Sequence, residues 1–235
     1  MVPAGEVHVW CSSLAVDDDE LAHALSLLDE RERARAERLR VPAVRRRFIA
    51  ARAALRTVLG ESTGTEPAAI RFAYGERGKP RLAAGGPHFN ASDSGDWAVV
   101  ALADTELGID LEVVRKLRNA DGLARRICTE RELERFERLP EPERDAALLR
   151  LWTCKEAGLK ALGVGLAGGA RNVEVELGAD GRARLRRLCG EVDGWALLAV
   201  DLGPELECSV IVRSTGRPEL RMRSRLGGSS GTMHR

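Results

Sequence analysis

Residues that could transfer a proton or bind an ion, Glu156 and Lys160, lie in the stretch 151–166, LWTCKEAGLKALGVGL. If this stretch is helical, Trp152, Glu156 and Lys160 lie one turn apart on a single face. Gly163 would then end the helix, because glycine readily adopts the left-handed conformation that stops it. A carboxylate and an ammonium one turn apart usually form only a weak, exposed ion pair. This spacing alone therefore does not define a site.

A second acidic pair lies upstream, in the sequence GIDLE at 108–112. Strand alternation would place Asp110 and Glu112 on one face, and Ile109 and Leu111 on the other, where they can face the core. Two neighbouring carboxylates repel each other unless a cation lies between them. Mg²⁺ is the natural occupant, because it takes hard oxygen ligands. The alternative is a solvated strand end, which a DxE pair in isolation does not exclude.

The elements that must position these groups can be predicted from capping residues and hydrophobic periodicity. Pro42 predicts the start of a helix that ends at Gly60 and carries five arginines beside its apolar stripe. Short strands should follow, separated by turns at GERGKP and AAGGP. The segment NASDSGD, 90–96, is predicted as a polar loop, and the apolar run 97–103 as a buried strand.

The second half repeats this order of elements. Thr129 and Glu132 form a capping-box pattern at the start of a helix. Pro140 and Pro142 end that helix, and the long helix with the acidic and basic candidates follows. Four strands are then expected, with the last one ending at Val212.

This echo predicts an α+β fold of two similar subdomains. We expect them to be related by a pseudo-two-fold axis, each with helices packed on a small antiparallel sheet, and the active site to lie in the cleft between them. The expected ranges are 1–104 and 105–213. The segment 214–235 has few large apolar residues, so we expect a disordered tail there.

The composition argues against several classes of protein. Lys plus Arg number 37 and Asp plus Glu 36, so the net charge is near +1 and gives no general attraction to nucleic acid. The five cysteines form no CxxC pair and the four histidines are scattered, which argues against a disulfide framework and a zinc site. We find neither a signal peptide nor an apolar run of the ~20 residues that a membrane span needs, so we expect a cytoplasmic protein.

The segments FNASDSGDWAVVALA, GIDLE and WTCKEAGLKALGVGL, in this order and spacing, resemble the 4′-phosphopantetheinyl transferases of the large, surfactin-synthetase-activating type. That family is marked by a GKP turn, an FNxSHS loop, GxDxE and WxxKEAxxKxxGxGL. Each mark has a counterpart between Gly78 and Leu166. The helix that carries Arg45–Arg56 is also similar to the family's N-terminal phosphate-binding helix.

The resemblance implies transfer of the 4′-phosphopantetheine arm of coenzyme A to a serine of an apo acyl or peptidyl carrier protein. It also implies that Mg²⁺ is used and 3′,5′-ADP released. Asp110, Glu112 and Glu156 would hold Mg²⁺ against the pyrophosphate. Glu156 could also take the proton from the carrier serine, and Lys160 would stabilise or protonate the leaving phosphate.

Further residues would bind coenzyme A if the resemblance holds. The arginines of the N-terminal helix would contact the 3′-phosphate through forked contacts. The GKP turn would contact adenine and phosphate, and a serine of the FNxSHS-like loop would donate its hydroxyl. A lysine of the long helix would lie near the edge of the ligand. These candidates are Arg47, Arg52, Lys79, Pro80, Ser92, Asp93 and Lys155.

Asp93 departs from the family pattern, which has histidine between the two serines. An ionised aspartate cannot donate a hydrogen bond to phosphate and repels it. Three explanations are open: Asp93 turns toward an arginine, the affinity for coenzyme A is lower, or the protein is degenerate. The last would make the chain a non-catalytic module that binds coenzyme A or a carrier protein.

The partners expected are coenzyme A and an apo carrier protein, with the chain acting as a monomer. Carrier proteins are typically acidic near the modified serine, and Arg125, Arg126 and Arg131 could meet that charge. Ordinary solvated arginines are the alternative. A nucleic-acid binder using Arg45–Arg56 and the tail is a third hypothesis, but few aromatic residues (4%) are available for base stacking.

Overall fold

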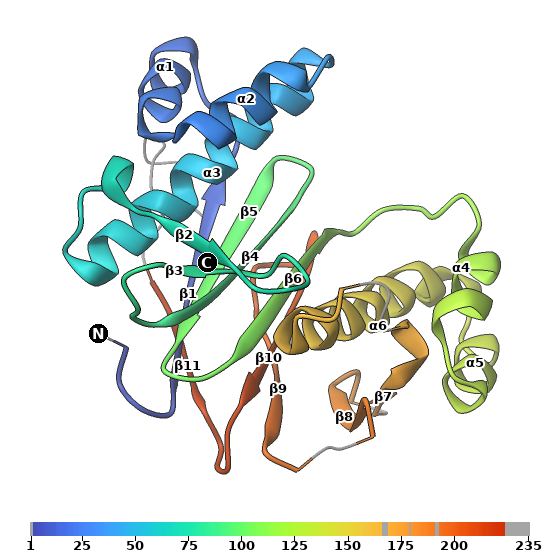
Figure 1. Cartoon of the computed structure of the whole chain (residues 1–235). Helices are drawn as coiled ribbons and strands as arrows, with labels where there is room; N and C mark the ends of the chain where they lie inside the picture. Colours follow the sequence, from blue (N-terminus) through green and yellow to red (C-terminus); the bar gives the residue numbers. More distant parts are fainter. Residues whose placement is uncertain (1, 166–168, 179, 191–192, 224–235) are drawn as a thin grey trace.

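The computed structural model describes residues 2–165, 169–178, 180–190 and 193–223 (Figure 1). The first half contributes β1 (Glu6–Ser13), α1 (Asp18–Leu27), α2 (Glu30–Arg38), α3 (Pro42–Thr63), the 3₁₀ turn η1 (Pro67–Ala69), β2 (Phe72–Tyr74), β3 (Pro80–Leu82), β4 (His88–Ser94) and β5 (Trp97–Ala103). The second half contributes β6 (Leu107–Val113), α4 (Ala120–Ile127), α5 (Glu130–Glu137), α6 (Glu141–Leu162), the 3₁₀ turn η3 (Ala170–Asn172), β7 (Val173–Leu177), β8 (Ala183–Leu188), β9 (Trp195–Ala199) and β10 (Leu206–Arg213). A last strand, β11 (Glu219–Met222), follows.

The two halves share one connectivity. In the first half β1 pairs antiparallel with β5, which pairs antiparallel with β4. In the second half β6 pairs antiparallel with β10, which pairs antiparallel with β9. Each half also has a separate hairpin, β2–β3 or β7–β8, and a third helix of 22 residues. The predicted mixed α+β class with similar halves is confirmed, although α4 was not predicted.

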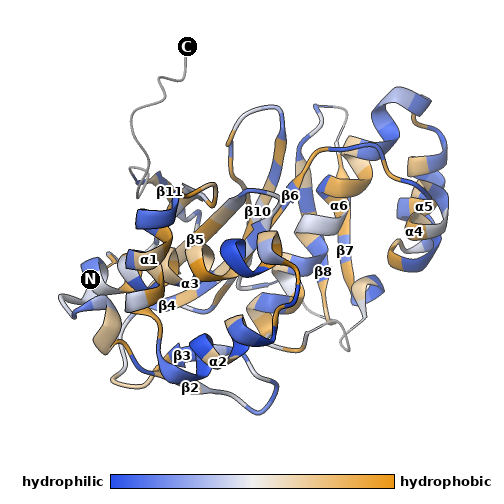
Figure 2. Cartoon of the chain, turned by 90° about the horizontal axis from the view of Figure 1, so that it is seen from above, coloured by the Kyte–Doolittle hydropathy of each residue, from blue (hydrophilic) through white to orange (hydrophobic). Residues whose placement is uncertain are grey.

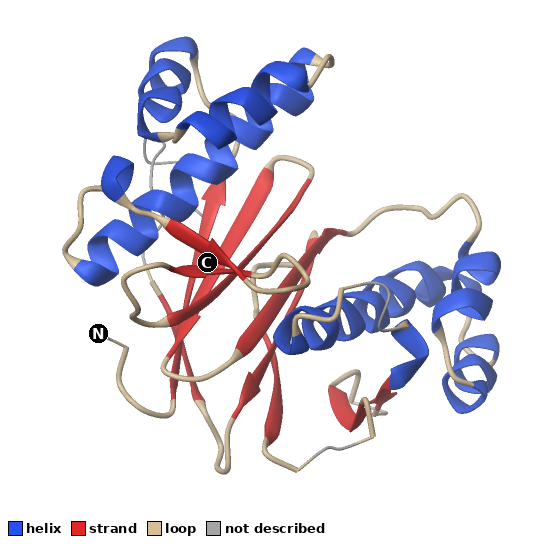
Figure 3. Ribbon diagram, viewed as in Figure 1, coloured by secondary structure: helices blue, strands red, loops and turns tan. Residues whose placement is uncertain are grey.

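The sheets and long helices form layers (Figures 1 and 3). Apolar side chains of β1 and β5 meet those of β6 and β10 in a core between the two sheets. The other face of the first sheet packs under α3 through residues such as Trp10 and Leu102. In the second half α6 packs on the sheet and on the β7–β8 hairpin. Hydrophobic residues accordingly lie along the strands, while α2 is largely hydrophilic (Figure 2).

The predicted end of α3 at Gly60 is wrong. The helix continues to Thr63 and ends at Gly64, whose φ of 70° is left-handed. Gly60 stays inside the helix because the following turn folds back on it: a Cβ there would lie 2.7 Å from the carbonyl oxygen of Thr65. Glycine at this position therefore permits a close backbone approach rather than stopping the helix.

The predicted polar loop at 90–96 is also largely wrong, because β4 extends through Ser94. The polar composition of this segment favours a loop in sequence-based prediction. Its polar residues lie in a strand because their side chains have partners on a neighbouring element, as described below.

The prediction that 214–235 is a disordered tail is wrong for the part that the structure describes. β11 pairs in parallel with β1, and the Arg223 guanidinium donates to the ring of the buried His8. This strand was missed because its partner lies more than 200 residues away in the sequence. Residues 224–235, and Leu166 of the 151–166 motif, lie outside the described residues.

Candidate active site at the meeting of β4, β6 and α6

The two halves meet where β4 lies beside β6, and serine hydroxyls join them there. The hydroxyl of Ser92 donates to Asp110 Oδ1 at 2.8 Å, and that of Ser94 donates to Glu112 Oε2 at 2.9 Å. The Ser94 hydroxyl also accepts from the backbone N–H of Val113. The polar residues of β4 therefore hold the two predicted carboxylates of β6 at fixed positions.

Helix α6 approaches β6 closely because Gly108 has no side chain. A Cβ on Gly108 would lie 2.1 Å from the carbonyl oxygen of Ala157 and 2.3 Å from the amide nitrogen of Ala161. Both are backbone atoms of α6 that cannot move away independently. The glycine of GIDLE is thus needed to bring the acidic strand within reach of Glu156 and Lys160.

Lys160 reaches from α6 into the acidic strand. Its ammonium donates to Asp110 Oδ1 at 2.6 Å, to the Ser92 hydroxyl at 2.9 Å and to the carbonyl of Ile109 at 3.2 Å. All three of its donors are therefore used within the seam between the halves. The structure places Lys160 beside the predicted acids, with the carboxylate of Asp110 as its partner; its predicted role toward the leaving phosphate stays a prediction.

Glu156 lies one turn before Lys160 and is half-buried. Burial, reinforced by the negative charge of Asp110, raises the pKa of Glu156 above its ordinary value. Burial also raises the pKa of Asp110, against the opposing effect of Lys160. Glu112 acts on both carboxyls in the same sense, so these three acids form one electrostatic cluster.

Two oxygens of this cluster lack partners. Asp110 Oδ2 and Glu156 Oε1 are buried and have no hydrogen-bond partner among the described residues. A buried carboxylate oxygen without a partner is costly. An oxygen-seeking divalent cation would satisfy both, so the donor set fits Mg²⁺ in its chemistry.

The side chains do not yet converge as a ligand group. Within the described residues, no three Asp, Glu, His or Cys side chains are arranged to hold a metal ion. Lys160 and Ser92 contact one oxygen of Asp110, and Arg115 and Ser94 contact one oxygen of Glu112. A cation would have to compete with these bonds.

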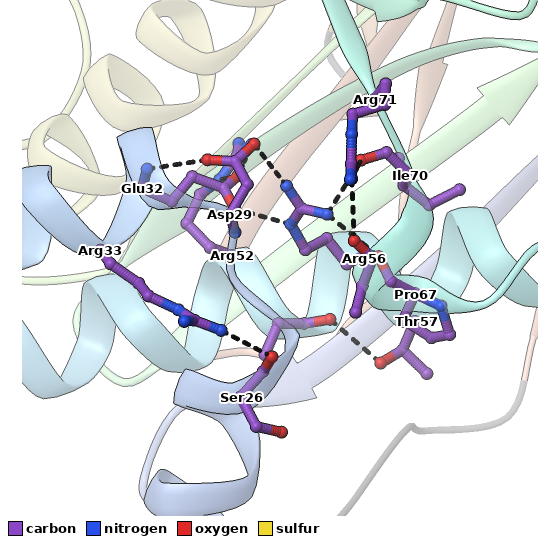
Figure 4. Close-up of polar contacts among 12 residues, drawn as sticks. Ser26, Asp29, Glu32, Arg33, Arg52, Arg56, Thr57, Pro67, Ile70 and Arg71 are labelled. Atoms are coloured by element: carbon purple, nitrogen blue, oxygen red, sulfur yellow. Dashed lines mark hydrogen bonds and ion pairs between the residues drawn. The ribbon is translucent and has the colours of Figure 1, made fainter.

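Four arginines of α3 have partners within the first half: Arg46, Arg47, Arg52 and Arg56. Arg56 is fully buried and donates to Glu32, Asp29 and two backbone carbonyls of the 65–70 region (Figure 4). Arg52 donates to the other oxygen of Glu32 at 2.7 Å and lies over the Phe72 ring. Arg52 therefore has a structural partner where a phosphate was expected.

Arg47 is more accessible than Arg52. Its Nε donates to Asp96 at 2.7 Å, in the turn between β4 and β5, and 42% of its side chain is exposed. An exposed pair of this kind is weak and exchanges readily. Of the two predicted 3′-phosphate ligands, the structure leaves Arg47 the freer.

Lys79 and Pro80 lie where the β2–β3 hairpin meets the end of α6. They line a pocket of about 360 Å³ together with Phe89 and Leu162. The Lys79 ammonium donates to two backbone carbonyls of the second half. Its partner thus differs from the one predicted.

Lys155 was predicted to lie near the edge of coenzyme A, and the structure contradicts this. Its side chain is fully buried, and its ammonium contacts Glu132 at 2.8 Å and the carbonyls of Ala170 and Val173. Lys155 points about 100° around the helix from Glu156, which directs it into the core of the second half. A buried ion pair with Glu132 is its role here.

Asp93 is exposed and forms no ion pair with any described residue. Alternation along β4 places it on the same side of the strand as Phe89 and Ala91, which pack in the core under α3. The explanation that Asp93 turns toward an arginine is therefore not seen in the structure.

Sequence reasoning missed two arginines that pair with carboxylates of β6 and β10. Arg115 donates to Glu112 at 2.7 Å, and a basic residue three positions after an acid was an available signal. Arg150 holds Glu207 in a forked contact at 2.6 and 3.0 Å. Glu207 lies directly opposite Glu112 in the β6–β10 register, and no local pattern reveals that pairing.

Comparison with known proteins agrees with this geometry. Residues 106–211 match the model of the 4′-phosphopantetheinyl transferase superfamily, and residues 15–105 match the 4′-phosphopantetheinyl transferase N-terminal model. Together the two matches include α3, the β4–β6 seam and α6. The chain belongs to the 4′-phosphopantetheinyl transferase superfamily, which confirms the predicted family and class of enzyme.

Among similar proteins, the 4′-phosphopantetheinyl transferase HetI of Nostoc sp. is 38% identical over 90% of this chain and 88% of its own length. The 4′-phosphopantetheinyl transferase psf-1 of Bacillus pumilus is 33% identical over 66% of each chain. A solved holo-[acyl-carrier-protein] synthase of Thermotoga maritima is 24% identical, covers 48% of this chain and 64% of its own, and has a TM-score of 0.37. No helix in the described part of this chain is long and apolar enough to cross a bilayer.

Proposed function

We propose that this chain transfers the 4′-phosphopantetheine group of coenzyme A to a serine hydroxyl of an apo acyl or peptidyl carrier protein. The observation that carries the proposal is the cluster of Asp110, Glu112, Glu156 and Lys160 between β6 and α6. Family membership supports the same reaction, since the relatives above are named 4′-phosphopantetheinyl transferases.

We assign the divalent cation, Mg²⁺, to Asp110, Glu112 and Glu156. Support comes from the two partnerless carboxylate oxygens and from the closeness of three acids, whose burial and mutual repulsion raise the pKa values of Asp110 and Glu156. When bound, Mg²⁺ would supply charge neutralisation at the pyrophosphate. On binding, Lys160 would give up its contact with Asp110.

Glu156 is the proposed general base. It would take the proton of the carrier serine as the serine oxygen bonds to the phosphorus that bears pantetheine. The bond from that phosphorus to the bridging oxygen breaks, and 3′,5′-ADP leaves with the electron pair. The partnerless oxygen of Glu156 supports this role, because it is not committed to a hydrogen bond within the protein.

Lys160 would then stabilise the leaving group. Once released from Asp110, its ammonium can donate to the developing charge on the departing phosphate. Ser92, which now bridges Lys160 and Asp110, is placed to donate its hydroxyl to the same phosphate region.

The remainder of coenzyme A would bind along the first half. Arg47 is the proposed ligand of the 3′-phosphate, because its exposed pair with Asp96 can be exchanged for a phosphate contact. The pocket lined by Pro80 would take the adenine. Asp93, exposed without an ion pair, is expected to lower the affinity for coenzyme A.

We also propose a cytoplasmic monomer that serves carriers of fatty-acid, polyketide or non-ribosomal peptide assembly. A single chain supplies both sides of the seam, which supports a monomer. No disulfide bond is present among the described residues, which suits a reducing compartment. The exposed Arg125, Arg126 and Arg131 offer positive charge to an acidic carrier.

Intact-mass analysis of apo carriers tests the proposal. After incubation with the protein, coenzyme A and Mg²⁺, at least one carrier of a panel should become heavier by one phosphopantetheine. The alternative, a non-catalytic homologue suggested by Asp93, would bind coenzyme A or carrier in calorimetry without any mass change. That pattern across the panel would refute the transferase assignment.

A further inference from the structure

Lys79 belongs to the first half of the chain, yet both acceptors of its ammonium belong to the second half. The ammonium donates to the carbonyl of Leu107 at 2.9 Å and to the carbonyl of Ala161 at 2.8 Å. Leu107 begins β6, the strand of Asp110 and Glu112, and Ala161 directly follows Lys160. One side chain thus ties the β2–β3 hairpin to both elements that carry the acidic cluster.

The contact at Ala161 matches the needs of a helix end. The last carbonyls of a helix have no partner within the helix and carry partial negative charge, which favours a cation. The Lys79 side chain also packs on the cap of α6: a Cβ on Gly163 would lie 3.3 Å from Lys79 Cδ. A larger residue at Gly163 would crowd the lysine as well as strain the left-handed turn, where φ is 65°.

We propose that Lys79 is a positioning residue, an intramolecular clamp between the halves, rather than a ligand of a coenzyme A phosphate. The inference rests on the proposed function for its catalytic consequence, but the clamp itself is a property of the free protein. The side chain is largely removed from solvent, and this burial lowers the pKa of Lys79 to about 8.

The two roles have different kinetic consequences. Loss of a phosphate ligand removes binding energy for coenzyme A and raises its KM. Loss of a clamp lets β6 and α6 shift relative to each other, which misplaces Asp110, Glu156 and Lys160 and lowers kcat. The comparison substrate 3′-dephospho-coenzyme A lacks only the 3′-phosphate. Loss of a 3′-phosphate ligand would therefore affect coenzyme A but not this substrate, whereas loss of the clamp would affect both.

The experiment measures kcat and KM for both substrates with Lys79→Met, Lys79→Gln and Lys79→Arg. Arg77→Met, an exposed basic residue in the same turn, is the matched control and should leave the kinetics unchanged. Hydrogen exchange of the backbone amides of β6 and of the last turn of α6 is followed in the free protein. Lys79→Gln keeps an uncharged N–H donor group and serves if the methionine variant does not fold.

The clamp predicts a kcat lower by about tenfold or more in Lys79→Met, a KM for coenzyme A within about twofold of wild type, and equal losses with both substrates. Exchange in β6 and α6 should become faster, and Lys79→Arg should restore part of kcat. A KM increase of about tenfold at unchanged kcat, or variants that match wild type in exchange and kinetics, would overturn the clamp. If wild type transfers nothing, the proposed function fails, while hydrogen exchange still decides the clamp.

Discussion

Each carboxylate between β6 and α6 has a different set of partners, and this difference separates their roles. Asp110 shares one oxygen between Ser92 and Lys160 and keeps the other free. Glu112 is held by Ser94 and Arg115. Glu156 keeps a buried oxygen without a partner. The last of these is the least committed to structure, which supports its proposed role as the general base.

Glu156→Gln should remove the base without changing the shape of the site. We expect kcat to fall by about 10²–10⁴-fold, because a glutamine cannot accept the serine proton. Quantitative mass spectrometry of the holo carrier measures this. Glu143→Gln, an exposed position in the first turn of α6, is the control that should retain activity. Near-normal kcat in Glu156→Gln would remove this residue from the chemistry.

Lys160→Met should increase the affinity of the coenzyme-free protein for Mn²⁺ by about tenfold. The ammonium now neutralises Asp110. A neighbouring opposite charge typically shifts the pKa of a carboxyl by one unit or more, and we expect an effect of similar size, about tenfold, on cation binding. Titration of Mn²⁺ followed by electron paramagnetic resonance reports binding independently of activity. Lys116→Met, an exposed lysine away from Asp110, should bind Mn²⁺ like wild type. Weaker Mn²⁺ binding in Lys160→Met would contradict a cation site at Asp110.

At the scale of elements, the distance between β6 and α6 depends on Gly108. The strand brings two acids, the helix brings a base and an ammonium, and both backbones must come close for these groups to meet. Asn90 supports the arrangement by accepting the backbone N–H of Ile109 at 2.9 Å. The polar face of β4 and the small residue in β6 therefore act together to position β6 against α6.

Gly108→Ala should destabilise the fold by about 3 kcal/mol, because the added methyl group would meet backbone atoms of α6 at 2.1 and 2.3 Å. Urea unfolding followed by tryptophan fluorescence measures the change. Gly216→Ala, where the new Cβ would meet nothing within 4 Å, should cost less than about 0.5 kcal/mol. Equal stability of the two variants would show that α6 does not lie as close to β6 as described.

At the scale of the whole molecule, the chain is built from one pattern used twice, with different residues in each copy. The third helix of the first half, α3, carries Arg52 and Arg56, whose partners are Glu32 and Asp29. The third helix of the second half, α6, carries Glu156 and Lys160. The repeat thus supplies a scaffold twice, while only the second copy contributes the acidic cluster.

Local patterns were sufficient for much of this arrangement. Alternation placed Asp110 and Glu112 together, Gly163 ends α6 with a left-handed φ, and the capping box of Thr129 and Glu132 is present. Each depends on neighbours within a few residues.

Other features depend on distant partners. Lys155 is buried because Glu132 and the segment near η3 surround it, and Lys79 finds its acceptors 28 and 82 residues away. The polar strand β4 was predicted as a loop because its composition is polar, and composition does not show that its side chains have partners on β6. Such partners are set by the tertiary fold, which local sequence does not specify.

The acidic cluster should make the stability of the metal-free protein depend on pH. Burial raises the pKa values of Asp110 and Glu156 above their ordinary 3.8 and 4.5, so the folded state binds these protons more tightly than the unfolded state. The free energy of unfolding should therefore decline as the pH rises above about 4.5, until both groups are ionised in the folded state. Urea unfolding at several pH values measures it.

The Asp110→Asn, Glu156→Gln double variant lacks both titrating groups and should show a smaller decline with pH. Saturating Mg²⁺ should offset the decline in wild type, because the bound cation favours the ionised carboxylates. A decline of the same size in the double variant would place its origin elsewhere in the molecule.

The most direct test of the account is the stoichiometry of the reaction under metal control. Holo carrier and 3′,5′-ADP are quantified together after treatment with EDTA and again after Mg²⁺ is restored. We expect almost no product with EDTA, and equal amounts of the two products once Mg²⁺ returns. Full transfer in EDTA, or 3′,5′-ADP released without holo carrier, would contradict a cation-dependent transfer at Asp110, Glu112 and Glu156.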